Sequence, residues 1–117
     1  MTYDDFTTAH ADVAHVELVL TDPSGIARGK WAPVATLKKA LAEGVNFPLS
    51  LHGLDVWGNE VADTGLHISS GDLDGFCRAV PHTFSPVPWG QANAQVVLET
   101  AAPDGTEFGG CARTVLR

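Results

Sequence analysis

The sequence predicts an α+β domain in which a mixed sheet has one helix packed across it. Two strand-like runs joined by a short turn lie near the N-terminus, and a segment with helical periodicity follows them. Further strand-like runs occupy the second half of the 117 residues. Two adjacent strands, one helix and a group of later strands have the order of a β-grasp domain, and the length suits a single domain.

The first two strands are predicted from the segment HVELVLTDPSGIARGKW. His15–Thr21 is mostly β-branched and aliphatic, and residues 26–31 form the returning strand. Residues 22–25 (DPSG) are typical of a tight turn, because proline presets one turn dihedral angle and glycine supplies the positive one. The preceding residues 2–12 are polar, and we interpret them as a short helix or a loose arm.

The helix is predicted from the spacing of its apolar residues. Pro33 suits a first-turn position, and Leu37, Ala40 and Leu41 recur at i, i+3 and i+4. Gly44 is placed to end the helix in a left-handed conformation. A helix of about three turns is marginal alone, so it must pack on the sheet to be stable.

The second half of the chain is less regular. Residues 45–64 are interpreted as a long, unusually apolar loop, and loops of this kind often bind a partner. The segments that follow are predicted as strands at 66–69, 76–80 and 94–100, and as turns at 70–75 and 103–105.

Composition excludes several classes of function. Seven basic and fourteen acidic residues give a net charge of −7, which makes nucleic acid a poor partner. No apolar run approaches the ~20 residues of a membrane span, and the N-terminus lacks the basic residues of a signal peptide. Two cysteines do not make a disulfide framework, so a reducing cytoplasm is the expected location.

The stretch SGIARGK resembles a phosphate-binding loop but has the wrong spacing. That motif needs four residues between its glycines and a hydroxyl residue after the lysine. Here Gly25 and Gly29 enclose three residues, and Trp31 follows Lys30. The motif also needs a helix that begins at the lysine, whereas Lys30 lies in a predicted strand.

Other candidate groups also favour structural roles. The histidines lack the short spacing of structural zinc sites, so no metal is expected at His10, His15, His52, His67 or His82. Asp72 and Asp74 are expected to cap turns rather than to form a catalytic pair. Cys77 and Cys111 have no basic neighbour in sequence that would activate a nucleophile. The tryptophans are expected to be core or interface anchors: Trp31, Trp57 and Trp89.

The sequence resembles the N-terminal β-grasp domain of the glutamine synthetase family, and most of all the glutamine-synthetase-like γ-glutamyl-amine ligases of actinobacteria. The matching segments are VELVLTDPSGIARGK, LKKALAEGVNF, SLHGLDVWGNEV, SGDLDGFCRAVPHTFSPVPW, AQVVLETAAPDGTEF and ARTVLR. They span nearly the whole chain. The fold signature of the family falls on Asp22, Gly25, Gly29, Lys30 and Arg113.

The resemblance implies that residues 1–117 form the N-terminal domain, with the catalytic domain absent. In the parent enzyme, ATP and magnesium would be held by that C-terminal domain, and this domain would bind no cofactor and have no activity alone. The family assembles as rings in which the small domain reaches the active site of a neighbouring subunit. The expected partners are therefore the catalytic domain and neighbouring subunits, with no nucleic acid or membrane.

The resemblance also assigns a site to the loop that follows the helix. In glutamine synthetases this loop contains an aspartate that helps to hold ammonium, and Pro48 stands in its place here. Since proline cannot stabilise or deprotonate ammonium, the parent enzyme is expected to prefer a larger amine. The residues expected to shape the acceptor site in the neighbouring subunit are Ser50, His52, Asp55 and Trp57.

A second hypothesis remains open. The chain could be a stand-alone β-grasp binding module without catalytic activity, because one fold hosts many functions. The ligase-domain hypothesis is favoured, since the sequence stops inside what looks like the start of a structural element. It also predicts exposed strand edges and self-association through the apolar loop.

Overall fold

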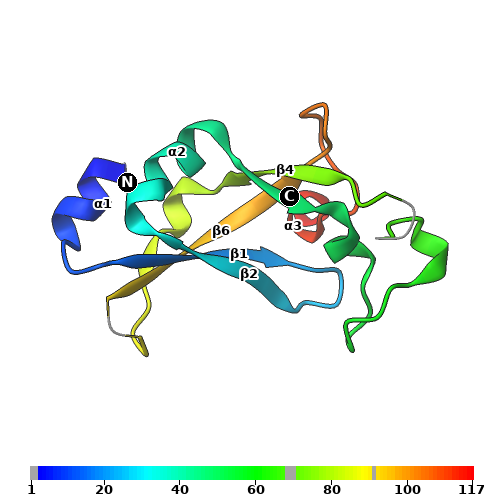
Figure 1. The fold of residues 1–117 in the computed structure, drawn as a ribbon, viewed down its shortest axis with the longest axis horizontal. Coiled ribbons are helices and arrows are strands. Elements are labelled where there is room, and N and C mark those ends of the chain that lie inside the picture. The colour runs from blue at the N-terminus through cyan, green and yellow to red at the C-terminus, as the bar shows by residue number, and fades with distance from the viewer. Residues whose placement is uncertain (1–2, 68–70, 91) are drawn as a thin grey trace.

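A computed structural model describes residues 3–67, 71–90 and 92–117, which form an α+β domain around one curled sheet (Figure 1). In the described residues the sheet has six strands. They are β1 (His15–Thr21), β2 (Ala27–Pro33), β3 (Val45–Pro48), β4 (Asp74–Ala79), β5 (Ser85–Pro86) and β6 (Asn93–Ala101). The order is β2-β1-β6-β4-β3, with β5 paired to β6 beyond the end of β4. The predicted mixed sheet is confirmed, since β1 and β6 are parallel and the other pairs are antiparallel.

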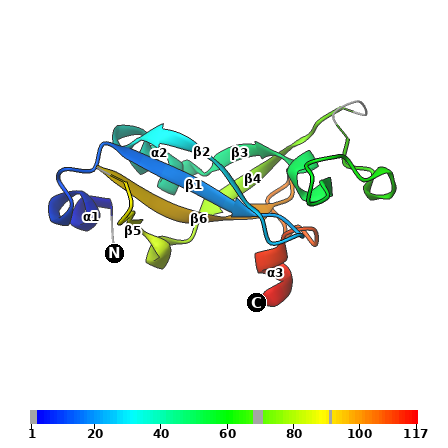
Figure 2. The ribbon, with the colours of Figure 1, turned by 90° about the horizontal axis from the view of Figure 1, so that it is seen from below.

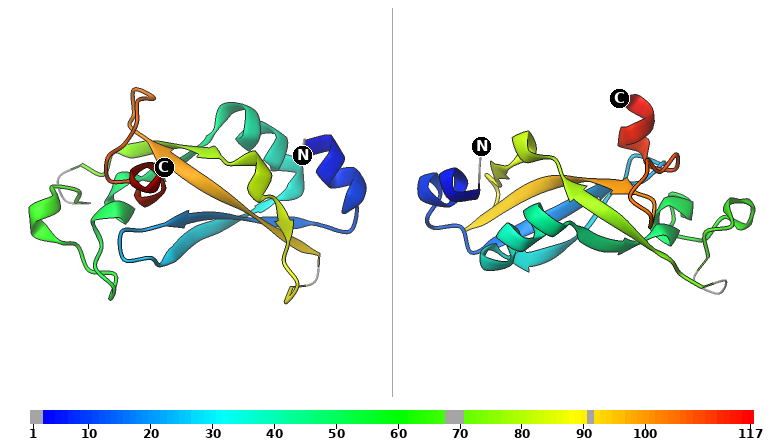
Figure 3. Two further views of the ribbon diagram at one scale, coloured as in Figure 1. Left: turned by 180° about the vertical axis from the view of Figure 1, so that it is seen from behind. Right: turned by 90° about the horizontal axis from the view of Figure 1, so that it is seen from above.

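The helices lie at the ends and on the two sides of this sheet. They are α1 (Tyr3–Ala9), α2 (Val34–Glu43) and α3 (Ala112–Leu116), with 3₁₀ turns at η1 (Leu49–Gly53), η2 (Ala62–Thr64) and η3 (Pro81–Thr83). Figures 2 and 3 show that α2 and α3 lie on opposite sides of β6. The sequence allowed residues 2–12 to be either a short helix or a loose arm, and the structure shows a helix over Tyr3–Ala9. None of the described helices is long and apolar enough to cross a membrane.

The first hairpin forms as predicted, with His15 opposite Pro33 and Thr21 opposite Ala27. Gly25 has a φ of 78°, and its amide donates to the Asp22 carbonyl at 3.0 Å. The Asp22 side chain, 2% exposed, accepts from the amides of Ser24 and Ile26 at 2.9 Å and from Arg28 Nε at 2.8 Å. The turn is thus built around a buried carboxylate whose acceptor capacity is used inside the hairpin.

Helix α2 packs on the sheet through Leu37, which is 1% exposed. It ends where the sequence predicts, and Gly44 has a φ of 79°. Its ψ of −179° is extended, so the expected left-handed helical geometry is corrected to an extended positive-φ residue. A Cβ at Gly44 would also overlap the Phe76 ring, so both backbone angle and space require glycine.

The interpretation of residues 45–64 as a loop is partly wrong. Residues 45–48 form β3, which pairs with β4 from Val45–Cys77 to Pro48–Asp74. Pro48 is tolerated there because β3 is an edge strand and its last residue needs no donor. The remainder contains η1, η2 and an antiparallel bridge between Leu54 and Glu60.

Other boundaries differ more modestly. Residues 66 and 67 are not in a strand, and positions 68–70 of the predicted 66–69 strand and 70–75 turn lie outside the described residues. The strand expected at 76–80 begins at Asp74, so Asp74 pairs in the sheet and is not a turn cap. The 103–105 turn is confirmed by Gly105 N donating to Ala102 O at 2.8 Å.

The main core lies on the face of the sheet that α2 covers. Along β1, Val16, Leu18 and Leu20 are buried, whereas Glu17 and Val19 on the opposite face are half-buried. The core cluster comprises Phe6, Val13, Val16, Leu18, Leu20, Leu37, Phe47, Cys77, Phe84, Ala94, Val96 and Leu98. Cys77 and Cys111 are buried free thiols, and burial raises the pKa of Cys77.

The three tryptophans are not core residues. Trp31 lies opposite Glu17 in the β1–β2 ladder, so it projects from the face away from the core and is 57% exposed. Trp57 and Trp89 are 85% and 78% exposed. The core alternative is therefore wrong for all three, and only a surface role remains.

Replacement of Asp22 by alanine is expected to lower the free energy of unfolding by about 2–3 kcal/mol, because Arg28 and two amides lose a buried acceptor. Burial acts to raise the pKa of Asp22, but Arg28 and the amides of Ile26 and Ser24 lower it overall from 3.8. The contribution is therefore complete above pH 3.8 and is lost as pH falls through the lower folded value. Urea denaturation across this range checks both points, with Asp12→Ala, a change at an exposed turn residue, as control.

Replacement of Gly29 by alanine tests the close approach of β1 and β2. A Cβ at Gly29 would overlap the Leu18 carbonyl oxygen, and backbone cannot move away as a side chain can. We expect a loss of about 2–4 kcal/mol in thermal denaturation. Gly109→Ala, which would meet nothing within 4 Å, should change stability little. Equal effects of the two variants would contradict this account.

Candidate functional site

The most distinctive surface feature is the segment of residues 54–60, which we call the tip loop. It lies in the half of the molecule away from α1 (Figures 1 and 2), in a molecule whose longest extent is 46 Å. The Leu54–Glu60 bridge closes its base, and Asp55 N donates to Asn59 O at 2.8 Å. Gly58 takes a φ of 83°, which completes a compact turn. The tip loop is therefore a small hydrogen-bonded hairpin rather than a loose connection.

Asp55 organises the tip loop from within. Its Oδ1 accepts from Trp57 N and Asn59 N, each at 2.9 Å. Hydrogen bonding by the Asn59 amide, foremost among several donors, lowers the pKa of Asp55. The carboxylate is thus ionised at neutral pH and fixes the backbone that carries Trp57, whose side chain extends into solvent.

Ser50 and His52 lie at the base of this segment instead. They belong to η1 and are each 6% exposed. His52 Nε2 is 3.0 Å from Thr100 Oγ1 on β6, and its ring meets Phe108 edge-on with centroids 5.2 Å apart. The four residues expected to shape an acceptor site therefore divide into a buried pair and the Asp55–Trp57 pair at the tip. Their roles in such a site stay predictions.

The base is held against the sheet by close packing. The Leu49 amide donates to Leu73 O at 2.8 Å, and the Leu49 side chain lies over Gly75 of β4. A Cβ at Gly75 would come within 2.5 Å of Leu49 Cδ2 and 3.0 Å of Thr100 Cγ2. Sequence periodicity could not reveal this arrangement, because it depends on the side-chain order of β4 and β6.

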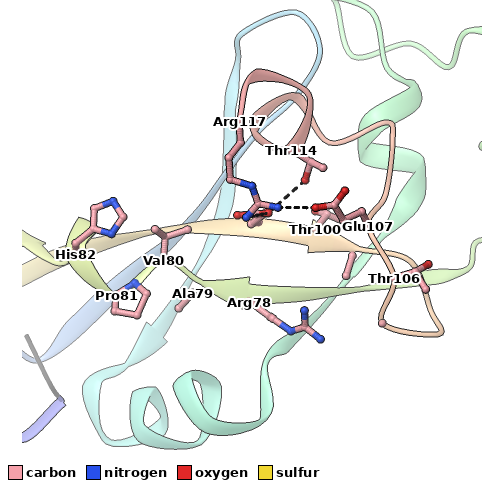
Figure 4. Close-up of a pocket in the computed structure, with 13 residues that line it drawn as sticks. Arg78, Ala79, Val80, Pro81, His82, Thr100, Thr106, Glu107, Thr114 and Arg117 are labelled. Carbon is pink, nitrogen blue, oxygen red and sulfur yellow. Dashed lines mark hydrogen bonds and ion pairs between the residues drawn. The ribbon is translucent and has the colours of Figure 1, made fainter.

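A second feature is a groove of about 410 Å³ between β4, β6, the 105–107 turn and α3 (Figure 4). Arg117 spans it, donating to Glu107 at 2.8 Å and lying 2.9 Å from Glu99. Thr114 Oγ1 also donates to Glu99, at 3.3 Å. The charged side chains on this side of the groove therefore largely pair with one another, and these contacts join α3 to β6. The Glu99–Arg117 contact was not anticipated from the sequence.

The fold-signature residues act inside the domain. Lys30 Nζ donates to Asn46 O at 3.3 Å and lies 4.6 Å from the centroid of the Phe47 ring. Arg28 Nε lies 2.8 Å from Asp22 Oδ2 within the first hairpin. Arg113 Nε is 3.8 Å from Glu99 Oε2. Gly25 and Gly29 belong to the hairpin, and no helix begins at Lys30, which agrees with the exclusion of a phosphate loop.

Within the described ranges 3–67, 71–90 and 92–117, no group of three or more His, Cys, Asp or Glu side chains could hold a metal ion. Asp72 is exposed and Asp74 pairs in β4, so they do not form a paired carboxylate site.

Comparison with known proteins identifies relatives, although no family model matches the chain. The sequence is 36% identical over 103 residues to gamma-glutamylputrescine synthetase PuuA of Escherichia coli (strain K12), covering 84% of the chain and 22% of that protein. A solved glutamine synthase homologue superposes over 90% of the chain and 25% of its own, with a TM-score of 0.76 and 26% identity. Apo GmaS superposes over 88% of the chain and 21% of its own, with a TM-score of 0.66 and 17% identity, which supports the fold alone.

The curled mixed sheet and the α2 helix packed on it define an α+β domain of the β-grasp type. Together with these matches, they show that the chain belongs to the glutamine synthetase family and corresponds to its N-terminal domain. The chain spans 22% of the length of the curated relative and 21–25% of the solved structures. This coverage is consistent with a domain of a larger multi-domain enzyme of the glutamine-synthetase-like ligases.

Replacement of Asp55 by alanine is expected to loosen the tip loop without unfolding the domain. Two amides lose their shared acceptor, so hydrogen exchange at residues 56–59 should accelerate while β1 and β6 amides stay protected. Exchange measured by NMR checks this, and Trp57→Ala serves as control because an 85% exposed side chain contributes little to the fold. Unchanged exchange in Asp55→Ala would show that the turn is held by other contacts.

Proposed function

We propose that residues 1–117 are the N-terminal domain of a glutamine-synthetase-like ligase that joins glutamate to an amine. A separate catalytic domain would hold ATP and magnesium and form the γ-glutamyl phosphate that the amine attacks. The 36% identity to a gamma-glutamylputrescine synthetase supports this reaction class. In the proposal the domain is inactive alone, because its described residues offer neither a metal site nor a phosphate-binding loop.

The tip loop is the part of the domain proposed to act, by reaching the active site of a neighbouring subunit in a ring. The observation that carries this is Trp57, which is 85% exposed on a turn fixed by Asp55. A large aromatic held in solvent by an ordered backbone is typical of an anchor that a partner covers. A flexible loop would lose conformational entropy when it binds a partner, whereas this hydrogen-bonded turn is already ordered before binding.

The proposed acceptor is an amine larger than ammonia. Pro48, the last residue of β3, brings no carboxylate to the place where the resemblance puts an ammonium-holding aspartate. At the tip, an ionised Asp55 and the face of Trp57 are both attractive to an alkylammonium group. The name of the relative, gamma-glutamylputrescine synthetase, is compatible with a diamine of this kind.

The test is a steady-state assay of the full-length protein with glutamate, ATP and either ammonium or putrescine. We expect turnover with the diamine and poor turnover with ammonium. Trp57→Ala should raise the KM for the diamine about tenfold, equivalent to about 1.4 kcal/mol. Trp89→Ala is the matched control, because Trp89 is 78% exposed but lies outside the tip loop.

Two results would contradict the proposal. Efficient glutamine synthesis from ammonium would contradict the proposal that the acceptor is a larger amine. Equal kinetics for the two tryptophan variants would contradict the proposed role of the tip loop in the active site. A reading frame that contains no catalytic domain would instead favour the stand-alone binding module. The isolated chain, assayed alongside, is expected to release no ADP.

A further inference from the structure

His52 is a buried titratable group that lies outside the tip loop on which the proposed function rests. It lies in η1 at the base of the tip loop and is 6% exposed. One ring nitrogen, Nε2, is 3.0 Å from Thr100 Oγ1, and Thr100 Oγ1 is 3.4 Å from Cys77 Sγ. The other nitrogen, Nδ1, is buried and has no hydrogen-bond partner among the described residues.

The charge state of His52 decides whether the unpaired Nδ1 is a buried acceptor or a buried charged donor. A neutral imidazole has one donor and one acceptor, so Nε2–H can donate to Thr100 while Nδ1 stays a bare acceptor. A protonated ring donates from both nitrogens, and the Nδ1–H would then be a buried donor with no acceptor. The imidazolium would also place a positive charge in a mostly apolar site.

The charged surroundings of His52 do not compensate for this. The charge whose field reaches it is the Asp22 carboxylate of the first hairpin, which favours protonation. That carboxylate already accepts from Arg28 and two amides, so its own charge is partly balanced. The groups that contact the ring, Thr100 on β6 and Phe108 before α3, are uncharged. Cys77 on β4, which contacts Thr100, lies in the field of the Lys30 ammonium, and that positive charge does not favour a second one on His52.

We propose that His52 is a proton-sensitive latch: the neutral ring holds residues 49–53 on β4 and β6, and protonation releases this base together with the tip loop. The two move together because Val61 N donates to Gly53 O at 2.9 Å and thus ties the far end of the tip loop to η1. This inference goes beyond the proposed ligase function and can be tested on the chain itself.

The direction of the pH effect follows from burial. Desolvation lowers the pKa of His52 from 6.5, and the Asp22 charge opposes the shift only in part. Because the released state binds the proton more readily, the latched state is fully stable above about pH 6.5 and loses stability as pH falls toward the lower folded value. Below that value no further loss comes from this group.

The experiment follows the unmodified chain by NMR from pH 8 to pH 5. The His52 ring resonance should titrate below pH 6.5. Over the same range, amide protection at residues 49–61, corrected for intrinsic exchange, should fall at least tenfold relative to β1 and β6 amides. A His52 resonance that titrates at or above pH 6.5, or protection that stays constant, would overturn the proposal.

Two matched variants identify the source of the effect. His52→Gln can still donate to Thr100 but cannot gain a proton, so the pH dependence of protection at 49–61 should disappear. His82→Gln, the same change at an exposed histidine, should leave it intact. A pH response that persists in His52→Gln would overturn the proposal. If that variant does not fold, the titration of the unmodified chain decides alone.

Discussion

The parallel pairing of β1 with β6 is the contact on which the rest of the domain depends. It joins the first strand of the chain to the last, with Val16 beside Ala94 and Leu18 beside Val96. These buried pairs lie on the sheet face that α2 covers. In the described strands, β6 is also the strand that joins β4 and β3 to β1 and β2. Since such long-range pairing must overcome a large loss of chain entropy, local hairpin and helix formation alone would not specify the fold.

Asp22 and His52 are two of the four buried polar residues in the described part of the chain, and they are accommodated differently. Asp22 receives three donors within one hairpin, so its charge is supported by residues close in sequence. His52 depends on Thr100, contributed by a distant strand, and keeps one nitrogen without a partner. The first group therefore stabilises a local turn under nearly all conditions, whereas the second joins two distant segments under a narrower set of conditions.

The elements that sequence reasoning could predict are those with local causes. The first hairpin has turn residues between two β-branched runs, and α2 has apolar spacing and a terminal glycine, so both were found nearly to the residue. The strand β3 was missed because it is short, ends in Pro48 and exists through pairing with β4. The position of His52 was equally inaccessible, since it depends on which face of β6 carries Thr100.

Exposure of the tryptophans illustrates a further limit. A large aromatic is usually buried, and composition gives no sign that Trp31 would project from the face of the sheet opposite the core. Only the ladder, which places Trp31 beside Glu17 rather than Leu18, decides its environment. The tip loop lies inside the 45–64 segment that the sequence predicts as a long apolar loop, but its internal hydrogen bonding could not be predicted from the sequence.

That internal order has a consequence for the speed and selectivity of encounters. A turn that already holds its bound-like shape needs no slow folding step after contact, so association would be limited by collision and orientation. It also presents the same surface shape to every partner, so the turn could not rearrange to fit a surface of poor shape complementarity. A short aspartate-centred turn thus acts as a rigid template, and selectivity would depend on the shape of whatever meets it.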